Sequence, residues 1–200
     1  MRFLLAFSRG IDSVTTALGR AMWWLTLFMV LIGAYNVVTR YAFGAIANLF
    51  GDRVALLLSG NVYLELQTYA YDLVFLLGAA YVFKADAHVR VDIIFSRLSA
   101  RAKSWIDIAG ATLFLIPFCT LGIFFSQSYV ARSWRQLEVS PNPGGLPRYP
   151  IKTVIIIAFA LLIAQAISET IKNIAFLRGH PNSGSIHAKE QTAEPVVESV

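Results

Sequence analysis

Four long apolar runs dominate the pattern of hydrophobic and polar positions along this chain. They cover about residues 18–38, 62–83, 105–130 and 151–171. A helix needs roughly 20 mostly apolar residues to cross the hydrocarbon core of a bilayer, and each run is long enough. The pattern therefore predicts an all-α integral membrane protein whose membrane domain, residues 1–178, contains four transmembrane helices.

The residues before the first span have the spacing of an amphipathic helix. The apolar ones share one helical face: Phe3, Phe7, Ile11, Val14 and Leu18. The polar ones fall elsewhere: Arg9, Asp12, Thr16 and Arg20. This pattern predicts a short amphipathic helix on the inner membrane surface, with a frayed start of the first span as the alternative. We expect the first span to be retained, because it is longer than the usual 7–15 apolar residues of a signal peptide.

The remaining segments are expected to connect the spans or to lie outside the membrane. Residues 44–61 contain an apolar run that is too short to span and fits the outer interface or a partner. Residues 141–150 (PNPGGLPRYP) have the Pro and Gly content of an ordered, irregular turn. Residues 179–200 carry too little apolar surface to fold and are predicted to be a disordered cytoplasmic tail. Pro117 is expected to kink the third span.

Composition and charge support a membrane protein and orient it. Hydrophobic residues make up 56% of the chain and charged residues 14%, whereas soluble domains carry roughly 25% charged residues. The net charge of +5 comes from Lys and Arg between apolar runs, which is typical of cytoplasmic loops rather than of nucleic-acid binding. Taken together, the segments before the first span, between the second and third, and after the fourth carry 11 of the 17 Lys and Arg residues, and the two other connections carry 6. Both termini are therefore predicted to be cytoplasmic.

Two carboxylates inside the second span are the first candidates for function. Asp72 lies near mid-depth and Glu65 near the outer edge, on a helical face with Tyr69, Leu76 and Ala79. Because a charge at the bilayer centre costs roughly 2.5–3.5 kcal/mol, this face should meet another helix rather than lipid. We take Glu65, Tyr69, Asp72 and Ala79 as a candidate partner interface whose carboxylates accept hydrogen bonds. A proton or cation path, or a carboxylate protonated in place, are the alternatives.

The other polar residues indicate no catalytic, cofactor-binding or metal site. Glu169 and Lys172 have the spacing of a local helical pair. All three histidines lie outside the spans, which argues against His-ligated haem in the membrane. Metal-ligand spacing, a Gly-rich phosphate loop and a Ser/His/Asp arrangement are all missing from the sequence. The sole cysteine, Cys119, is interpreted as a packing residue. We therefore expect that the chain is not an enzyme.

Two stretches of the chain resemble a known family. Residues 65–92 read ELQTYAYDLVFLLGAAYVFKADAHVRVD, and the end of this stretch, GAAY followed by HVRVD, is its most specific part. Residues 133–152 read SWRQLEVSPNPGGLPRYPIK. With four spans in 200 residues, they resemble the DctQ-type small membrane subunit of TRAP (tripartite ATP-independent periplasmic) transporters, closest to the mannitol/chloroaromatic or 2-oxo-acid branch. The resemblance covers roughly residues 15–178.

The resemblance implies that three proteins of the bacterial inner membrane and periplasm have separate roles in transport. A periplasmic binding protein captures an organic acid or related solute. A large DctM-type permease holds the substrate and sodium sites, and the small subunit is part of the fixed scaffold beside it. Transport is then driven by an ion gradient. We expect no cofactor and no nucleic-acid partner.

Two further groups of residues are candidates for contacts at the membrane surfaces. His88, Arg90 and Asp92 follow the second span and are expected to touch lipid head groups or the partner at the inner surface. The alternative is that Val89 and Val91 merely seat a connecting segment there. On the outer side, four residues are expected to brace the Pro-rich loop, or to touch the binding protein: Trp134, Arg135, Glu138 and Arg148.

Two other functions compete with the scaffold hypothesis. One is a self-sufficient, homodimeric, proton-coupled transporter that uses Asp72 and Glu65. The other is a membrane adaptor for an oxidoreductase. One mid-membrane carboxylate without a pair of broken helices is less than an autonomous transporter needs, so the sequence favours the scaffold.

Overall fold

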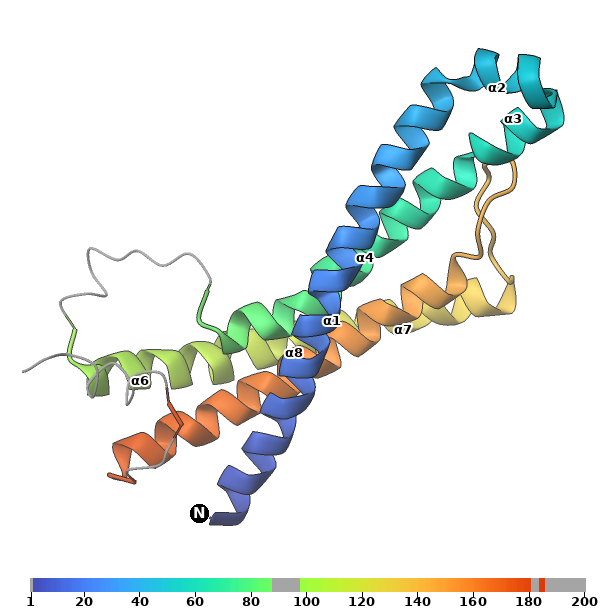
Figure 1. Ribbon diagram of the computed structural model, residues 1–200. Helices are drawn as coiled ribbons and strands as arrows, with labels where there is room; N and C mark the ends of the chain where they lie inside the picture. Colours follow the sequence, from blue (N-terminus) through green and yellow to red (C-terminus); the bar gives the residue numbers. More distant parts are fainter. Residues whose placement is uncertain (1, 88–97, 181–183, 186–200) are drawn as a thin grey trace, which may run out of the picture. The chain divides into compact units, whose positions relative to one another are not determined.

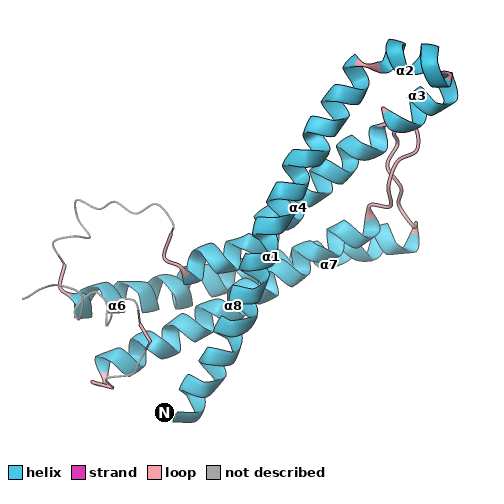
Figure 2. Ribbon diagram, in the orientation of Figure 1, coloured by secondary structure: helices cyan, strands magenta, loops and turns pink. Residues whose placement is uncertain are grey.

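The computed structural model describes residues 2–87, 98–180 and 184–185. This part of the chain is almost entirely helical and contains no β-strand (Figure 2). Its helices follow one another as labelled in Figure 1: α1 (Arg2–Tyr41), α2 (Phe43–Phe50), α3 (Asp52–Leu58), α4 (Asn61–Lys84), α6 (Ala100–Ala109), the π-helix η1 (Gly110–Leu115), α7 (Ile116–Arg135) and α8 (Tyr149–Leu177).

Four helical stretches of the described chain are long and apolar enough to cross a membrane. They are Phe3–Tyr41, Asp52–Lys84, Ala100–Arg135 and Tyr149–Leu177. Each stretch contains one of the apolar runs seen in the sequence, with helical residues added at both ends. The all-α fold with four membrane-spanning helices is therefore confirmed.

The first span and the amphipathic segment before it form one uninterrupted helix, α1. The sequence predicts a separate surface helix, but residues 2–41 contain no proline and nothing else ends the helix between the two parts. Phe3, Phe7 and Val14 are exposed on the N-terminal part, in keeping with its amphipathic pattern. The polar side of this part packs on α8 through Ser8 and Thr15, which are fully buried.

The segment between the first two long helices forms two short helices, α2 and α3, which pack against each other. Gly51 joins them with a φ of +88°, a backbone conformation that favours glycine. Large apolar side chains on both helices are exposed, among them Phe50 and Leu57. At roughly 1.5 Å per residue neither helix could cross a bilayer, in agreement with the short apolar run.

The third long stretch changes its hydrogen-bonding pattern just before Pro117. Six residues, Gly110–Leu115, form a π-helix, and Ile116 N–H donates to the carbonyl of Ala111, five residues earlier. Proline has no N–H, and its ring clashes with the carbonyl four residues before it. The wider π-turn accommodates this conflict in the residues before Pro117, and the kink expected at Pro117 stays a prediction.

The described chain forms two compact units, and each long helix contributes to both. The first unit contains Met1–Ala17, Ala79–Ile123 and Phe159–Val200, and the second contains Leu18–Gly78 and Phe124–Ala158. Close helix approach at small residues is found in each unit. A Cβ on Gly122 would lie 2.8 Å from the ring of Phe159, and one on Gly33 would lie 2.8 Å from the amide of Gln67.

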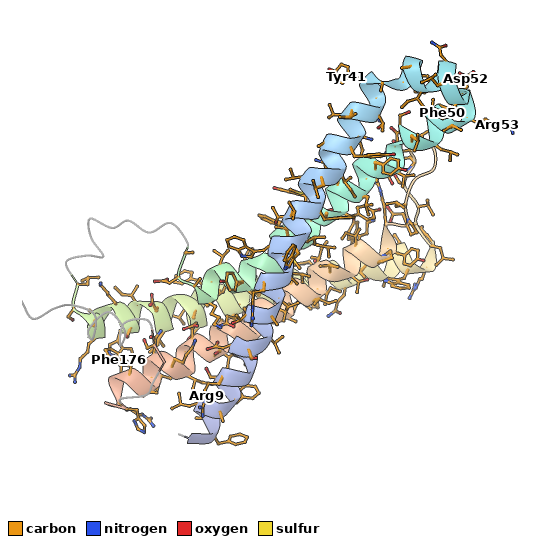
Figure 3. All side chains as sticks on the ribbon, in the orientation of Figure 1. Arg9, Tyr41, Phe50, Asp52, Arg53 and Phe176 are labelled. Atoms are coloured by element: carbon orange, nitrogen blue, oxygen red, sulfur yellow. The ribbon has the colours of Figure 1, made fainter. Side chains whose placement is uncertain are left out.

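Small residues fill the interior and large apolar residues cover the outside. Apart from Val130, the buried apolar residues of the described chain are alanines and Cys119. Large apolar side chains project from the long helices along their length (Figure 3), and Trp23 and Phe114 are 75% and 74% exposed. Helices in membranes pack through small residues and expose large apolar ones to lipid, so this distribution suits a lipid solvent.

Little of the C-terminal tail falls among the described residues. The disorder predicted for residues 179–200 therefore concerns residues that mostly lie outside them. Of the part that is described, Ser185 is fully buried and its hydroxyl lies 2.7 Å from Oδ1 of Asn173 on α8.

Candidate functional site

Buried polar side chains are the first place to look for function in a membrane protein, because they are costly there unless they have partners. In the described residues most of them gather in two clusters, one in each unit. The first, here called the loop clamp, consists of Glu65 and the residues of the α7–α8 loop that bind it. The second, here called the α1–α8 cluster, is centred on Asp12 and Lys172.

The loop clamp holds the segment between α7 and α8 against α4. Glu65 on α4 is 8% exposed. Its carboxylate accepts hydrogen bonds from Asn142 Nδ2 at 2.8 Å, from Leu146 N at 2.6 Å and from the Ser140 hydroxyl. All three donors belong to residues 136–148, which join the two helices. Tyr69, one turn further along α4, adds a hydrogen bond of 3.2 Å from its hydroxyl to the carbonyl of Pro147.

The loop has a defined hairpin shape that makes these contacts possible. Val139 and Pro147 form an antiparallel bridge, and Ser140 N donates to the carbonyl of Leu146 at 3.0 Å. Two glycines close the turn. Gly144 has a φ of +72°, and a Cβ on Gly145 would lie 2.5 Å from the Cβ of Ser140 and 2.8 Å from its carbonyl oxygen. The sequence predicts an ordered, irregular turn here, and the structure adds the bridge.

A second set of contacts fixes the same loop to the ends of α7 and α8. Trp134 Nε1 donates to Thr153 Oγ1 at 2.8 Å, and the Trp134 ring lies 4.6 Å from that of Tyr149. Glu138 accepts a hydrogen bond of 2.8 Å from Ser133 and forms an ion pair with Lys152. The hydrogen bond from Lys152 holds the pKa of Glu138 below its usual value. A carboxyl group with a lowered pKa stays ionised at neutral pH, so the contribution of this pair to stability is lost only in acid.

The α1–α8 cluster is an ionic network between the N-terminal part of α1 and the C-terminal part of α8. Lys172 Nζ lies 3.0 Å from Asp12 Oδ2 and also binds Glu169. Gln165 Nε2 and Ser168 Oγ each donate to Asp12 Oδ1 at 3.0 Å. Each of the three charged groups therefore has a partner of opposite charge, which a buried ion needs.

Further hydrogen bonds extend this cluster to neighbouring turns and to α4. Thr15 donates to Oε1 of Gln165 at 2.8 Å, and the hydroxyls of Ser8 and Ser168 lie 2.6 Å apart. Lys84 at the end of α4 donates to the carbonyl of Asp12 at 2.8 Å. The cluster thus ties three helices of the first unit together.

The four residues that the sequence places on one interface of the second span have different surroundings in the structure. Glu65 and Tyr69 bind the loop of their own chain. Asp72 is half-buried, and within the described part of the chain no group hydrogen-bonds its carboxylate. Ala79 is half-buried. The partner interface proposed for these residues is not tested by their positions, but the loop uses two of them.

The contacts expected for the surface residues are found for some of these residues and not for others. His88, Arg90 and Asp92 lie outside the described residues. Trp134 and Glu138 make the contacts given above, and Arg148 N donates to the carbonyl of Glu138 at 2.8 Å. Arg135 is exposed, and no hydrogen bond from its side chain to another described residue is present.

Most of the α1–α8 cluster does not follow from the sequence patterns described above. The spacing of Glu169 and Lys172 predicts a local pair, but it does not predict the ion pair of Lys172 with Asp12 or the hydrogen bonds of Gln165 and Ser168. A signal was available, because Ser8, Asp12 and Thr15 recur at helical spacing on one face of an otherwise apolar segment. The same spacing occurs in α8: Gln165, Ser168, Glu169 and Lys172.

Chemically, both clusters are suited to fixing helices and a loop in place. Their carboxylates are engaged by donors of the same chain. Among the described residues, no group of three or more His, Cys, Asp or Glu side chains could hold a metal ion. Cys119 is buried and unpaired by any disulfide. The arrangement is that of a rigid framework.

Comparisons with known proteins identify the family. Neither the curated proteins nor the solved structures contain a match to this chain. A family model described as "Tripartite ATP-independent periplasmic transporters, DctQ component" matches residues 29–176, which is well over half of the chain. The matched region includes the loop clamp and the α8 residues that bind Asp12: Gln165, Ser168 and Lys172. Members of this family are transporter components rather than enzymes, and the chain belongs to it: it is a DctQ-family component of a TRAP transporter.

Proposed function

We propose that this chain is the small scaffold subunit of a secondary, sodium-coupled TRAP transporter that imports an organic acid or a related solute. Its partners would be a large DctM-type permease and a periplasmic binding protein. The observation that carries the proposal is the family match over residues 29–176 in a chain with four membrane-spanning helices. The same two findings support a multi-pass protein of the bacterial inner membrane.

The use of polar groups within the chain supports a scaffold role. A transporter needs polar side chains that can bind and release a solute or an ion near mid-membrane. Here Glu65 and Asp12 are held by three or more hydrogen bonds or ion pairs each from the same chain. Groups bound in this way stabilise one arrangement of helices, which is what a fixed partner for a moving permease requires.

The self-sufficient transporter built on Asp72 and Glu65 has no support in these contacts. A proton relay through Glu65 would have to break its bonds to Ser140, Asn142 and Leu146 in each cycle. Loss of those bonds would release the α7–α8 loop from α4. The adaptor for an oxidoreductase likewise has no support in a family of transporter components.

The surface residues are assigned roles within this proposal. We take Trp134, Glu138 and Arg148 to brace the α7–α8 loop on the periplasmic side, supported by their contacts with Thr153, Lys152 and the loop backbone. Arg135 is exposed beside them and is free to meet the binding protein. At the cytoplasmic surface, three residues are taken to contact lipid head groups or the permease: His88, Arg90 and Asp92.

The test is uptake of candidate organic acids into proteoliposomes. This chain alone is expected to give no uptake above empty liposomes, because it supplies no transport site. This chain together with its large permease and binding protein is expected to give uptake that needs a sodium gradient. Replacing external sodium by choline at constant osmolarity is the control for the coupling ion. Uptake by this chain alone would refute the scaffold role.

A further inference from the structure

One face of α4 is exposed, and its members recur at helical spacing. The large or hydroxylated side chains on it recur at intervals of four, three and four residues: Leu64, Thr68, Tyr71 and Phe75. Leu64, Tyr71 and Phe75 are 41%, 55% and 66% exposed. Tyr71 and Phe75 stack with ring centroids 6.3 Å apart. Together with Asp72 these residues are called the Asp72 face.

Asp72 lies at the edge of this face, and its carboxylate determines which kind of surface can cover the face. It is in the middle of α4, half-buried, and no described group of its own chain hydrogen-bonds its carboxylate. A carboxylate at the centre of a bilayer costs roughly 2.5–3.5 kcal/mol when lipid surrounds it. A covering surface that supplies a hydrogen-bond donor removes this cost, and lipid chains cannot supply one.

Two other carboxylates of the chain, Glu65 and Asp12, have hydrogen-bond donors within the chain. Glu65, seven residues earlier on the same helix, has three donors from the α7–α8 loop. Asp12 in the other unit has donors from Gln165, Ser168 and Lys172. Asp72 is thus an ionisable group of a span that the described chain leaves without a donor, although it lies deep in the helix.

We propose that the Asp72 face is the docking surface for one transmembrane helix of the large permease, and that this helix presents a hydrogen-bond donor to Asp72. The inference rests on the proposed function. The spacing of the face fits a single partner helix packed along α4. The negative charge selects a partner with a Lys, Arg, Ser, Thr or Asn at mid-membrane. Gly78, one turn beyond Phe75, has open space around it and allows close approach of a second helix.

The first test is co-purification of the permease with the tagged chain from membranes in mild detergent. Asp72→Leu is expected to lower the recovery of permease roughly 3- to 20-fold, the range that corresponds to one interhelical hydrogen bond in a membrane. Asp72→Asn keeps an acceptor oxygen and is expected to retain most of the recovery. Asp52→Asn, the matched change at an exposed carboxylate at the start of α3, is the control and should leave recovery unchanged.

The second test identifies what covers the face. Phe75 is replaced by the photoreactive analogue benzoylphenylalanine, which has a similar aromatic body, and cells that express the whole transporter are irradiated. A cross-link to the permease is expected, and it should weaken when Asp72→Leu is added. The cross-linked peptide of the permease should carry a hydrogen-bond donor within one helical turn.

Several results would overturn the inference while leaving the proposed function intact. One is full recovery of the permease with Asp72→Leu. Another is a cross-link from Phe75 to lipid alone or to a second copy of this chain, with the permease still co-purifying. Failure of the proposed function looks different, because the wild-type chain would then recover no permease at all, and the inference would fall with it.

Discussion

At the scale of single residues, the α7–α8 loop depends on glycines as much as on the charge that holds it. Pro141 and Pro143 restrict the backbone, and Gly144 takes a φ of +72°. Gly145 lies so close to Ser140 that no side chain fits between them. The acceptor, Glu65, can therefore bind three donors of the loop only if the turn keeps this shape.

The first prediction concerns Gly145→Ala. The added Cβ would meet backbone oxygens of Ser140 and Asn142 at 2.8 and 2.9 Å, which cannot rotate away as a flexible side chain could. We expect a loss of about 1–3 kcal/mol in the free energy of unfolding, the usual cost of overpacking. Unfolding in detergent against SDS concentration measures it.

Gly10→Ala is the matched control for this change, because no heavy atom lies within 4 Å of the position its Cβ would take. Gly10 is inside α1, where alanine is the better helix former. The control should be neutral or slightly stabilising. Equal stability of the two variants would mean that the loop is not constrained as described.

At the scale of helices, the sequence could predict elements far better than the contacts between them. Each span contains enough consecutive apolar residues to be recognised from a local window. The partners of the Glu65 carboxylate lie 75 to 81 residues away, and those of the Asp12 carboxylate lie 153 to 160 away. No local pattern encodes such pairs. The sequence therefore predicts a partner interface on the polar face of α4, although Glu65 and Tyr69 bind the chain's own loop.

The local sequence pattern also could not predict whether the helix breaks between the surface segment and the first span. An amphipathic pattern describes which side of a helix is apolar, and it does not say where the helix bends. Here polar residues of the segment 2–17 bind residues of α8, and α1 continues without a break into the first span. Whether this part of α1 lies at the membrane surface stays a prediction.

The second prediction tests the tie between α1 and α8. Lys172→Met removes the cation between Asp12 and Glu169, which would leave two neighbouring carboxylates without it. Breaking a buried ion pair from one side costs about 3–5 kcal/mol, and we expect a loss in that range. Adding Glu169→Gln should restore part of the lost stability, because it removes one of the two negative charges that then repel each other. Detergent-to-SDS unfolding gives the comparison.

Arg178→Met is the control for the loss of a positive charge near the end of α8, since Arg178 is exposed. Its unfolding should match that of the wild type. If Lys172→Met behaved in the same way as Arg178→Met, the α1–α8 cluster would not be a stabilising element.

At the scale of the whole molecule, the arrangement of Lys and Arg predicts the orientation in the membrane. Both termini and the segment between α4 and α6 should be cytoplasmic, and the α7–α8 loop should be periplasmic. The third prediction follows from this, and the single cysteine makes it easy to test. In a Cys119→Ser background, Gln136→Cys should react with a membrane-impermeant maleimide in intact spheroplasts.

Arg101→Cys, at the start of α6, should react with the same reagent only after the membrane is broken. Both positions are exposed, so accessibility within the protein does not limit the reaction. The reverse pattern of labelling would invert the assignment. It would also move the Trp134 and Glu138 contacts to the cytoplasmic side, away from any periplasmic binding protein.

The long sequence separation of the loop clamp has a consequence for how the protein is made. When α4 leaves the ribosome, the residues that will bind Glu65 have not yet been synthesised. At about 5–20 residues per second, the 81 residues that separate Leu146 from Glu65 take roughly 4–16 s to synthesise. Throughout this interval the second span carries a carboxylate without its donors. Closure of the α7–α8 loop is therefore a late event of biogenesis, because it must wait until α7 and the loop have both been made.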